Sequence, residues 1–137
     1  LVLKSFGADI SGFPFVHSSA KIQIPWNLKM EHRACLGEHA NAYSLGRIEI
    51  LEGATVGQEV YLCTGTHDFS DPTLQLITKE IKIEEHAFVG ARTMVLPGVK
   101  VGKNAVLGAM SVVTKDVPPD QVVAGNPARK IGERSLF

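Results

Sequence analysis

The chain has 137 residues, of which 45% are hydrophobic and 20% are charged, a balance typical of a soluble protein with one folded domain. Its 14 Lys and Arg residues match its 14 Asp and Glu residues, so the formal net charge is zero and a nucleic-acid partner is not expected. No apolar run approaches the roughly 18 residues of a membrane span, and no signal-peptide pattern is visible.

Residues 1–20 form an N-terminal segment with little regular patterning. Four apolar residues predict the end of a helix that Gly7 stops: Leu1, Val2, Leu3 and Phe6. After Ile10 we expect an irregular first coil. Because the chain begins at Leu1 rather than Met, we also expect an N-terminal piece to precede it.

A period of six residues begins near residue 30. The first series of apolar residues spaced six apart contains Met30, Leu36, Ala42 and Ile48. A second series is shifted by two residues and contains Ile50, Val56 and Leu62. The shift predicts a short insertion at one corner of a coil, around residues 45–50.

A longer interruption follows Leu62. The next hexad would begin near Asp68, but regular spacing resumes only at Ile83. A loop of more than about a dozen residues in a compact repeat protein is usually functional. We therefore expect residues 67–82 to form an inserted loop that protrudes from one corner, with residues 78–82 rejoining the sheet.

The stretch from Ile83 to Pro118 divides into six consecutive hexads. The first position of each is aliphatic: Ile83, Val89, Val95, Val101, Leu107 and Val113. The fifth is small or β-branched: Ala87, Thr93, Val99, Ala105, Ser111 and Val117. A period of six fits neither an α-helix nor a flat strand, and it is the hexapeptide repeat of a parallel β-helix. We expect the aliphatic residue to point to the axis and the small residue to let the chain turn. Gly90, Gly102 and Gly108 are expected to supply backbone angles that a Cβ would forbid.

The fold class is therefore all-β, a β-helix of about four to five turns with three hexads per turn, within a single domain spanning residues 1–137. The repeats stop at Pro118, and residues 119–137 form a C-terminal tail. Val122 and Val123 predict a last strand, and residues 125–127 predict a turn. We expect residues 128–137 to begin a helix.

A single prism of this kind buries only a thin core. Side chains such as Met94, Val106 and Met110 remain on its outer faces. Apolar side chains there are readily buried against copies of the same chain, and a triangular prism packs naturally about a threefold axis. We expect a homo-oligomer.

Three segments resemble a known family: LCTGTHD (62–68), the repeats from residue 89 to residue 119, and AGNPARKI (124–131). They are similar to the hexapeptide-repeat acyltransferases, and within these to the sugar O-acetyltransferases. The segments PWNL, YSLGRI and LCTGTHDF look closest to the colanic acid and exopolysaccharide biosynthesis acetyltransferases. The resemblance, which covers residues 20–132, implies a left-handed coil and acetyl-CoA as donor. It also implies a homotrimer with active sites between neighbouring subunits.

His67 is the candidate catalytic residue. A sugar hydroxyl is a poor nucleophile at neutral pH, and an imidazole is the side chain best matched to taking its proton as the oxygen attacks a thioester. The position of His67 matches the catalytic histidine of the family. The alternative is an exposed loop histidine with no role.

The acceptor side is expected to include Asp68, Trp26, Phe69 and Ser44. Asp68 could bind an acceptor hydroxyl or orient His67, or it could only cap a turn. Trp26 and Phe69 offer flat apolar surfaces for a sugar ring or pack under the loop. Ser44 falls where the family often has an asparagine on the acceptor side, so acceptor recognition departs from the family pattern there.

For the donor, the resemblance implies five residues: Ala91, Ala109, Thr114, Lys115 and Arg129. The two alanines would act through backbone groups and leave room for the pantetheine arm, unless they serve only repeat packing. The two cations would neutralise CoA phosphates, unless they are merely solvated.

The other histidines raise one alternative, because the same prism fold hosts zinc carbonic anhydrases. They are His17, His32, His39 and His86. A zinc site needs three ligands in reach of one ion, and the spacing of these residues does not supply them. We expect no metal, and surface or turn positions for these side chains.

The sequence thus predicts an acetyl-CoA-dependent O-acetyltransferase that acts on a sugar or saccharide precursor. Two alternatives remain open: a different acceptor, either an amino sugar or a serine hydroxyl, and a non-catalytic trimeric scaffold. We expect a cytoplasmic protein, because acetyl-CoA is found there and no export signal is visible.

Overall fold

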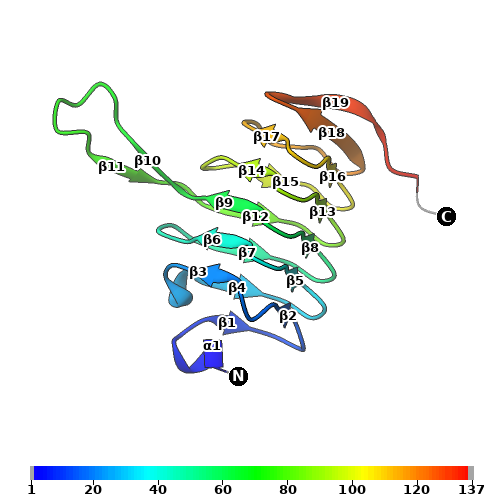
Figure 1. Cartoon of the computed structure of the whole chain (residues 1–137), viewed down its shortest axis with the longest axis horizontal. Coiled ribbons are helices and arrows are strands. Elements are labelled where there is room, and N and C mark those ends of the chain that lie inside the picture. Colours follow the sequence, from blue (N-terminus) through cyan, green and yellow to red (C-terminus); the bar gives the residue numbers. More distant parts are fainter. Residues whose placement is uncertain (1, 136–137) are drawn as a thin grey trace.

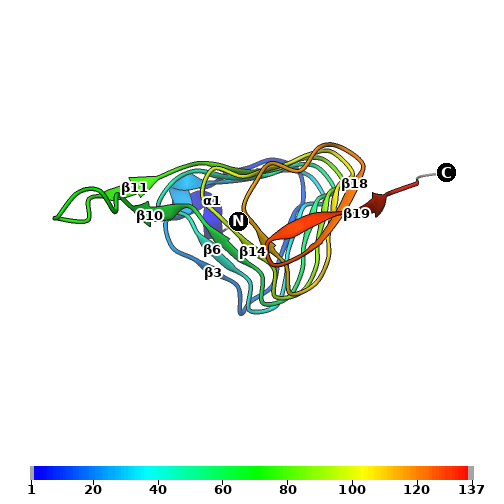
Figure 2. The ribbon, with the colours of Figure 1, turned by 90° about the horizontal axis from the view of Figure 1, so that it is seen from above.

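The computed structural model describes residues 2–135. The chain winds into a three-sided parallel β-helix, in which each coil adds one short strand to each of three sheets (Figures 1 and 2). Sheet I contains β1 (Asp9–Ile10), β4 (Leu28–Met30), β7 (Ile48–Ile50), β12 (Ile81–Ile83) and β15 (Lys100–Val101). Sheet II contains β2 (Phe15–Val16), β5 (Cys35–Leu36), β8 (Thr55–Val56), β13 (Phe88–Val89), β16 (Val106–Leu107), β18 (Gln121–Gly125) and β19 (Ala128–Glu133). Sheet III contains β3 (Lys21–Ile22), β6 (Asn41–Tyr43), β9 (Tyr61–Cys63), β14 (Met94–Val95) and β17 (Val112–Val113). The expected parallel β-helix is confirmed.

The coils stack in register, so that equivalent hexad positions lie above one another. In sheet I, Ile50 pairs with Met30 on one side and with Ile83 on the other, and Ile83 pairs in turn with Val101. Because a parallel neighbour repeats the same side-chain direction, each inward position becomes a column of like side chains along the axis.

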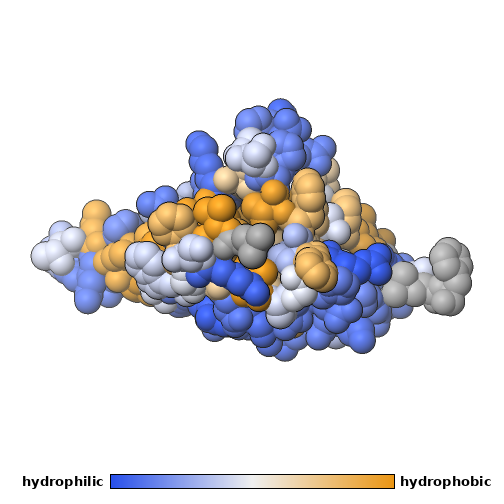
Figure 3. All heavy atoms as spheres, turned by 90° about the horizontal axis from the view of Figure 1, so that it is seen from below, coloured by the Kyte–Doolittle hydropathy of each residue, from blue (hydrophilic) through white to orange (hydrophobic). Residues whose placement is uncertain are grey.

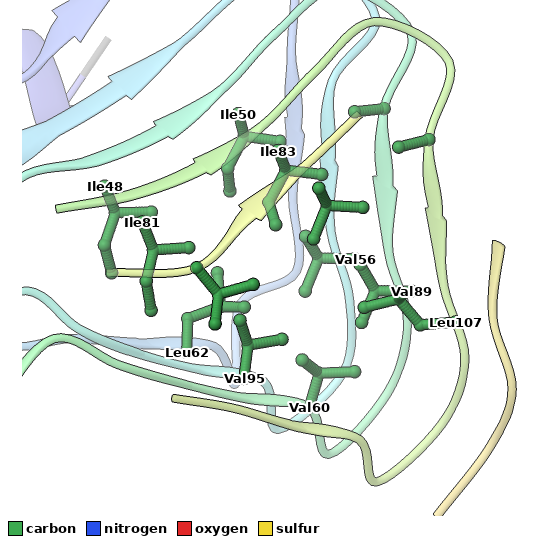
Figure 4. Packing of buried hydrophobic residues seen from close by; sticks show 14 of the residues in the cluster. Ile48, Ile50, Val56, Val60, Leu62, Ile81, Ile83, Val89, Val95 and Leu107 are labelled. Carbon is green, nitrogen blue, oxygen red and sulfur yellow. The ribbon is translucent and has the colours of Figure 1, made fainter. Parts of the chain in front are cut away.

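These columns form the core. The aliphatic first positions and the small fifth positions of the hexads from Ile83 to Pro118 are all buried, as expected (Figure 4). Burying one aliphatic side chain of this size contributes about 1.5–3 kcal/mol. Two fifth positions are polar, and their hydroxyls are satisfied internally: Thr93 Oγ1 and Ser111 Oγ both donate to the Gly108 carbonyl, at 3.0 and 2.6 Å. The repeat therefore tolerates a hydroxyl only where a backbone acceptor lies beside it.

The role expected for the hexad glycines was wrong. Gly90, Gly102 and Gly108 do not have the positive φ angles that require glycine, whereas Arg92 (φ 58°) and Asn104 (φ 60°) have them at the corners. The glycines are needed because the next coil passes too close. A Cβ built on Gly90 would lie 2.7 Å from Ala109 N and from Leu107 O.

The first coil is more regular than expected. A short helix, α1 (Val2–Ser5), ends before Gly7 (φ 90°), as predicted for the described residues; Leu1 lies outside them. The strands β1, β2 and β3 then pair in parallel with β4, β5 and β6, so the irregular coil expected after Ile10 was wrong. The coil above supplies backbone carbonyls in register; for example, Phe15 N donates to Ala34 O at 2.8 Å. Counting this coil, the β-helix has five complete coils and part of a sixth, slightly more than the four to five turns expected.

The lower end of the β-helix, below the first coil, is apolar. A hollow of about 800 Å³ there is lined mainly by apolar side chains, among them Leu3, Ile10, Val16 and Ile22. Figure 3 shows apolar residues gathered on this face.

The C-terminal tail is a strand rather than a helix. Residues 128–133 form β19, which runs antiparallel to β18 after a turn at residues 125–127. The helix expected from residue 128 onward was wrong. The top edge of sheet II offers unpaired backbone groups, and residues 128–133 pair with them as a further strand. Residues 136 and 137, which that expectation included, lie outside the described residues. In the described part of the chain, no helix is long and apolar enough to span a membrane.

A matched pair of glycine substitutions tests the packing role of the hexad glycines. Gly90→Ala should lower the free energy of unfolding by roughly 1–3 kcal/mol, since backbone atoms of the neighbouring coil must move. Gly132→Ala should leave it nearly unchanged, because a Cβ there would meet nothing within 4 Å. Urea unfolding of both variants measures the difference, and equal stabilities would contradict this explanation.

Candidate active site

One corner of the prism carries the insertions. We call it the III–I corner, since the chain passes there from sheet III to sheet I, at residues 23–27, 44–47, 64–80, 96–99 and 114–116. The longest of these passages forms an arm of two antiparallel strands, β10 (Gly65–His67) and β11 (Leu76–Thr78), which protrudes from the prism (Figures 1 and 2). The inserted loop expected at residues 67–82 is thus an arm that starts two residues earlier, and β12 rejoins sheet I.

The root of the arm is fixed to the coil below it. Thr64 is fully buried, and its hydroxyl donates to Tyr43 O at 2.6 Å and accepts from Gly46 N at 2.9 Å. Lys79 N donates to Thr64 O at 2.9 Å and closes the root from the returning strand. The arm therefore leaves the prism from a rigid point.

His67 is the last residue of β10, three residues beyond this fixed point. Its side chain is exposed, and its Nδ1 lies 2.7 Å from the Leu74 carbonyl across the arm. Its cross-strand partner is Leu76, whose side chain is half exposed on the same face. An exposed imidazole is thus held by one hydrogen bond on a rigid element.

The face of the arm that carries His67 continues onto Tyr43 and Leu45. A Cβ built on Gly65 would lie 3.1 Å from Leu45 Cδ1 and 3.3 Å from Tyr43 Cε1. The absent side chain of Gly65 leaves room between these groups and the His67 face. Sequence reasoning missed Tyr43, because only the register of β6 against β9 shows that it lies one coil below the arm.

Asp68 caps a turn in the arm. Its Oδ1 accepts from the Ser70 hydroxyl at 2.6 Å and from Ser70 N at 2.9 Å. These two hydrogen bonds, the side-chain one first, hold the pKa of the Asp68 carboxyl below its usual value. The hydrogen-bond partner of His67 is Leu74 rather than Asp68, so an orienting role for Asp68 is not supported, and acceptor contact stays a prediction.

The two aromatic candidates are both exposed. Phe69 is 82% exposed near the end of the arm, and Trp26 is 64% exposed in a 3₁₀ turn, Pro25–Asn27. That turn occupies the III–I corner two coils below the arm. Neither ring is buried in the core, so both are accessible to a ligand.

Ser44, in contrast, is used inside the corner. It is fully buried, its hydroxyl donates to Ile24 O at 3.0 Å, and it accepts from Ile24 N at 2.9 Å. The side chain ties two coils of the corner together. Its position does not support the expected contact with an acceptor.

The expected donor residues fall into two groups. Thr114 and Lys115 lie on the III–I corner two coils above the arm, and with Arg129 of β19 they line a pocket of about 240 Å³. Ala91 and Ala109 lie on the opposite corner, between sheets II and III, stacked in consecutive coils with Met110 N bonded to Ala91 O.

Sheet III separates His67 from these alanines within one chain. β9 and β14 pair through Tyr61 and Met94, which places Ala91 level with Gln58, nine residues before His67. At a strand rise of about 3.3 Å per residue, that is a path of up to about 30 Å. Within one chain, Ala91 and His67 thus lie on different corners of the prism.

The remaining histidines lie at the surface or in turns. In residues 2–135 no three His, Cys, Asp or Glu side chains gather around one point. His39 and His86 occupy left-handed corner positions (φ 54° and 59°), and His17 contacts Ser19. These are the surface and turn positions expected for them.

Comparisons with known proteins place the chain in one family. Residues 80–115 match the family model described as bacterial transferase hexapeptide (six repeats). A relative named "Putative colanic acid biosynthesis acetyltransferase WcaF" from Escherichia coli K12 is 38% identical over 133 residues, which cover 97% of this chain and 73% of that protein. A galactoside O-acetyltransferase from Lactococcus lactis is 44% identical over 84 residues, 56% of this chain and 40% of that protein.

Solved structures give the same fold. A maltose O-acetyltransferase from Clostridium difficile 630 superposes with a TM-score of 0.84 at 26% identity, covering 98% of this chain and 74% of its own. A hexapeptide-repeat acetyltransferase from Vibrio cholerae, solved with acetyl coenzyme A, gives 0.92 at 22% identity over 98% and 75%, a likeness that shows the fold alone.

A substitution of Ser44 tests its structural role. Ser44→Ala removes both hydrogen bonds to Ile24 and should lower the free energy of unfolding by about 1–3 kcal/mol. Ser19→Ala, which removes hydroxyl contacts at an exposed corner of the first coil, should cost less. Thermal melts compare the two, and an unchanged stability in Ser44→Ala would contradict the tie between coils.

Proposed function

The chain belongs to the hexapeptide-repeat acetyltransferases, and from that premise we propose that it transfers an acetyl group from acetyl-CoA to a hydroxyl of a sugar or saccharide precursor. The observation that carries the proposal is the exposed imidazole of His67. It stands at the end of β10, three residues beyond the fixed root of the arm, on the corner that also carries Thr114 and Lys115. The relatives named for colanic acid, galactoside and maltose support the class of acceptor.

The reaction needs one base. The imidazole of His67 takes the proton of the acceptor hydroxyl while that oxygen forms a bond to the thioester carbonyl carbon. The tetrahedral intermediate then collapses, the carbon–sulfur bond breaks, and the CoA sulfur leaves with the proton from the imidazolium. An ester and free CoA result, and the histidine is restored.

The donor occupies the two groups of residues described above. Lys115 and Arg129 place two exposed cations beside one pocket, which suits the phosphates of CoA. Thr114 adds a hydroxyl at its rim. Ala91 and Ala109 present small side chains at the other corner, which leaves room for the amide-rich pantetheine arm.

A homotrimer could bring the two donor groups together from neighbouring chains. Since sheet III separates the two donor groups within one chain, a neighbour whose alanine corner faces the arm completes the site. The outward side chains of sheet III support such a contact, because Tyr61, Met94 and Val112 are half-buried and uncharged there. Sheet I, in contrast, carries ion pairs such as Lys29–Glu31 and Arg47–Glu49 on its outer face.

The acceptor is placed on the His67 face of the arm. Asp68 offers an ionised carboxylate for sugar hydroxyls, and Trp26 and Phe69 offer exposed rings. Tyr43 joins this set through its position beside Gly65. We place the reaction in the cytoplasm, where acetyl-CoA is found.

Two matched histidine variants test the proposal. His67→Asn should reduce turnover by roughly 10²–10⁴-fold, the range typical for loss of a general base. His86→Asn should keep full activity, since His86 lies on the corner between sheets I and II and Asn tolerates its left-handed backbone. Release of free CoA thiol, followed over a panel of sugars at fixed acetyl-CoA, measures both.

Calorimetric titration with CoA is the control. It should show equal affinity in the wild type and in His67→Asn. Full turnover in His67→Asn would contradict the proposed mechanism. A wild-type chain that binds no CoA would instead favour a non-catalytic scaffold.

A further inference from the structure

The III–I corner is extended at a second place, below the arm. Its passages contain four residues in the second and fourth coils (44–47 and 96–99), but five in the first coil (23–27). The longer passage contains the 3₁₀ turn Pro25–Asn27, which presents the side chain of Trp26 to solvent. Tryptophan is highly buried on average in folded proteins, so an exposed ring on an extended corner points to a ligand.

The turn that carries Trp26 is fixed to the coil above it. The Asn27 side chain donates from Nδ2 to Ser44 O and to Leu45 O, both at 3.0 Å. Ile24, near the start of the passage, exchanges two hydrogen bonds with the Ser44 hydroxyl. The backbone beneath the ring is therefore rigid, which lowers the entropy lost when the ring binds a ligand.

Trp26 and His67 belong to the same side of the prism. Figures 1 and 2 show the 3₁₀ turn, drawn in light blue, on the side from which the arm protrudes. The coil between them contributes Tyr43 and Leu45, whose side chains lie 3.3 and 3.1 Å from a Cβ built on Gly65 of the arm. Leu45, whose carbonyl accepts a hydrogen bond from the turn below, thus lies against the arm above.

These side chains form an apolar strip that leads from the turn to the arm. We call it the corner strip, and it contains Trp26, Tyr43, Leu45 and Leu76, the last half exposed opposite His67 in the arm. From the coil of Trp26 to the root of the arm is a rise of two coils, or about 10 Å at strand spacing. One pyranose ring that presents a hydroxyl to His67 is too short to cover Trp26 as well.

The corner strip suits a neutral chain of sugars. Aromatic and aliphatic side chains pack on the C–H faces of sugar rings, while the hydroxyls of the sugars stay in water. Tyr43, Leu45 and Leu76 carry no charge. Arg47, at the end of the middle passage, is paired with Glu49 at 2.9 Å. These groups offer nothing to balance a diphosphate, which a nucleotide-activated sugar would bring.

We propose that the acceptor is an oligosaccharide that lies along this corner, with one sugar residue at His67 and another residue of the same chain stacked on Trp26. The inference narrows the acceptor class from any sugar to a chain of at least two sugars. Its catalytic part rests on the function proposed above, whereas the binding of saccharide to Trp26 does not.

Trp26 is the sole tryptophan among the 137 residues, so intrinsic fluorescence reports on this ring alone. Two series of probes change only the length of the chain: glucose, maltose and maltotriose, and galactose with its β-linked disaccharide and trisaccharide. Without acetyl-CoA present, the longer members of at least one series should shift the emission to shorter wavelength and protect the ring from acrylamide quenching. The single sugars should do neither.

Kinetics of CoA thiol release with the same probes give a second readout. In the wild type, kcat/KM should be roughly 3–10-fold higher for the longer acceptors than for the single sugar, the range expected for one aromatic contact. Trp26→Ala should lose this advantage, whereas Trp26→Phe, which keeps an aromatic ring, should retain most of it. Thermal melts should show that both variants fold, since the ring is exposed.

Phe13→Ala is the matched control. Phe13 is also an exposed aromatic residue, but it lies on the corner between sheets I and II, away from the arm. This variant should keep the wild-type dependence of kcat/KM on chain length.

Trp26 emission that no member of either series alters, or an unchanged dependence on chain length in Trp26→Ala, would overturn the proposal. A response to nucleotide-activated sugars alone would overturn it as well, because a nucleobase would then occupy the ring. Saccharide binding at Trp26 without any acetyl transfer would instead confirm the binding site and refute the proposed function. The two failures are therefore distinguishable.

Discussion

Hydrogen bonding between stacked coils is the constraint on which the rest of this structure depends. Backbone N–H groups of one coil donate to carbonyls of the next at corresponding positions, as Cys35 N does to Ala54 O and Phe88 N to Ala105 O, each at 2.8 Å. The coils therefore stay at strand spacing of about 4.8 Å along the whole axis. This spacing forces aliphatic columns inside and leaves no room for a Cβ where one corner passes over the next, as at Gly90.

The same constraint decides where extra residues can be inserted. A coil in register cannot accommodate extra residues within its strands, but a corner can extend outward without disturbing the columns. The arm does this: β9 ends at Cys63, and the chain rejoins the stack with Ile81 paired to Ile48. The prism thus gives His67 a rigid origin, while the arm gives it an open side. The cost of the rigidity is that residues on different corners of one chain cannot approach each other.

Much of this arrangement was predictable from the sequence. A period of six identifies the columns residue by residue, because each inward position must be aliphatic or small, and the break in the period after Leu62 identifies the arm. The tail was not predictable, since the preference of residues 128–133 for a strand arises from the free edge that β18 provides. The orientation of His67 was also not predictable, because the identity of Leu74 as a leucine does not indicate a left-handed backbone. Ser44 looked like a ligand-binding residue, although its hydroxyl is used between two coils.

The central claim is that each active site combines the arm of one chain with the alanine corner of another. Mixed trimers of two variants that we expect to be inactive test it most directly: His67→Asn, which lacks the proposed base, and Ala109→Trp, which would fill the proposed donor slot. Random assembly of equal amounts should restore about one quarter of wild-type activity, because one site in four then joins an intact arm to an intact alanine corner. If the mixture stays as inactive as its parents although mixed trimers have formed, each site lies within one chain and the account is wrong.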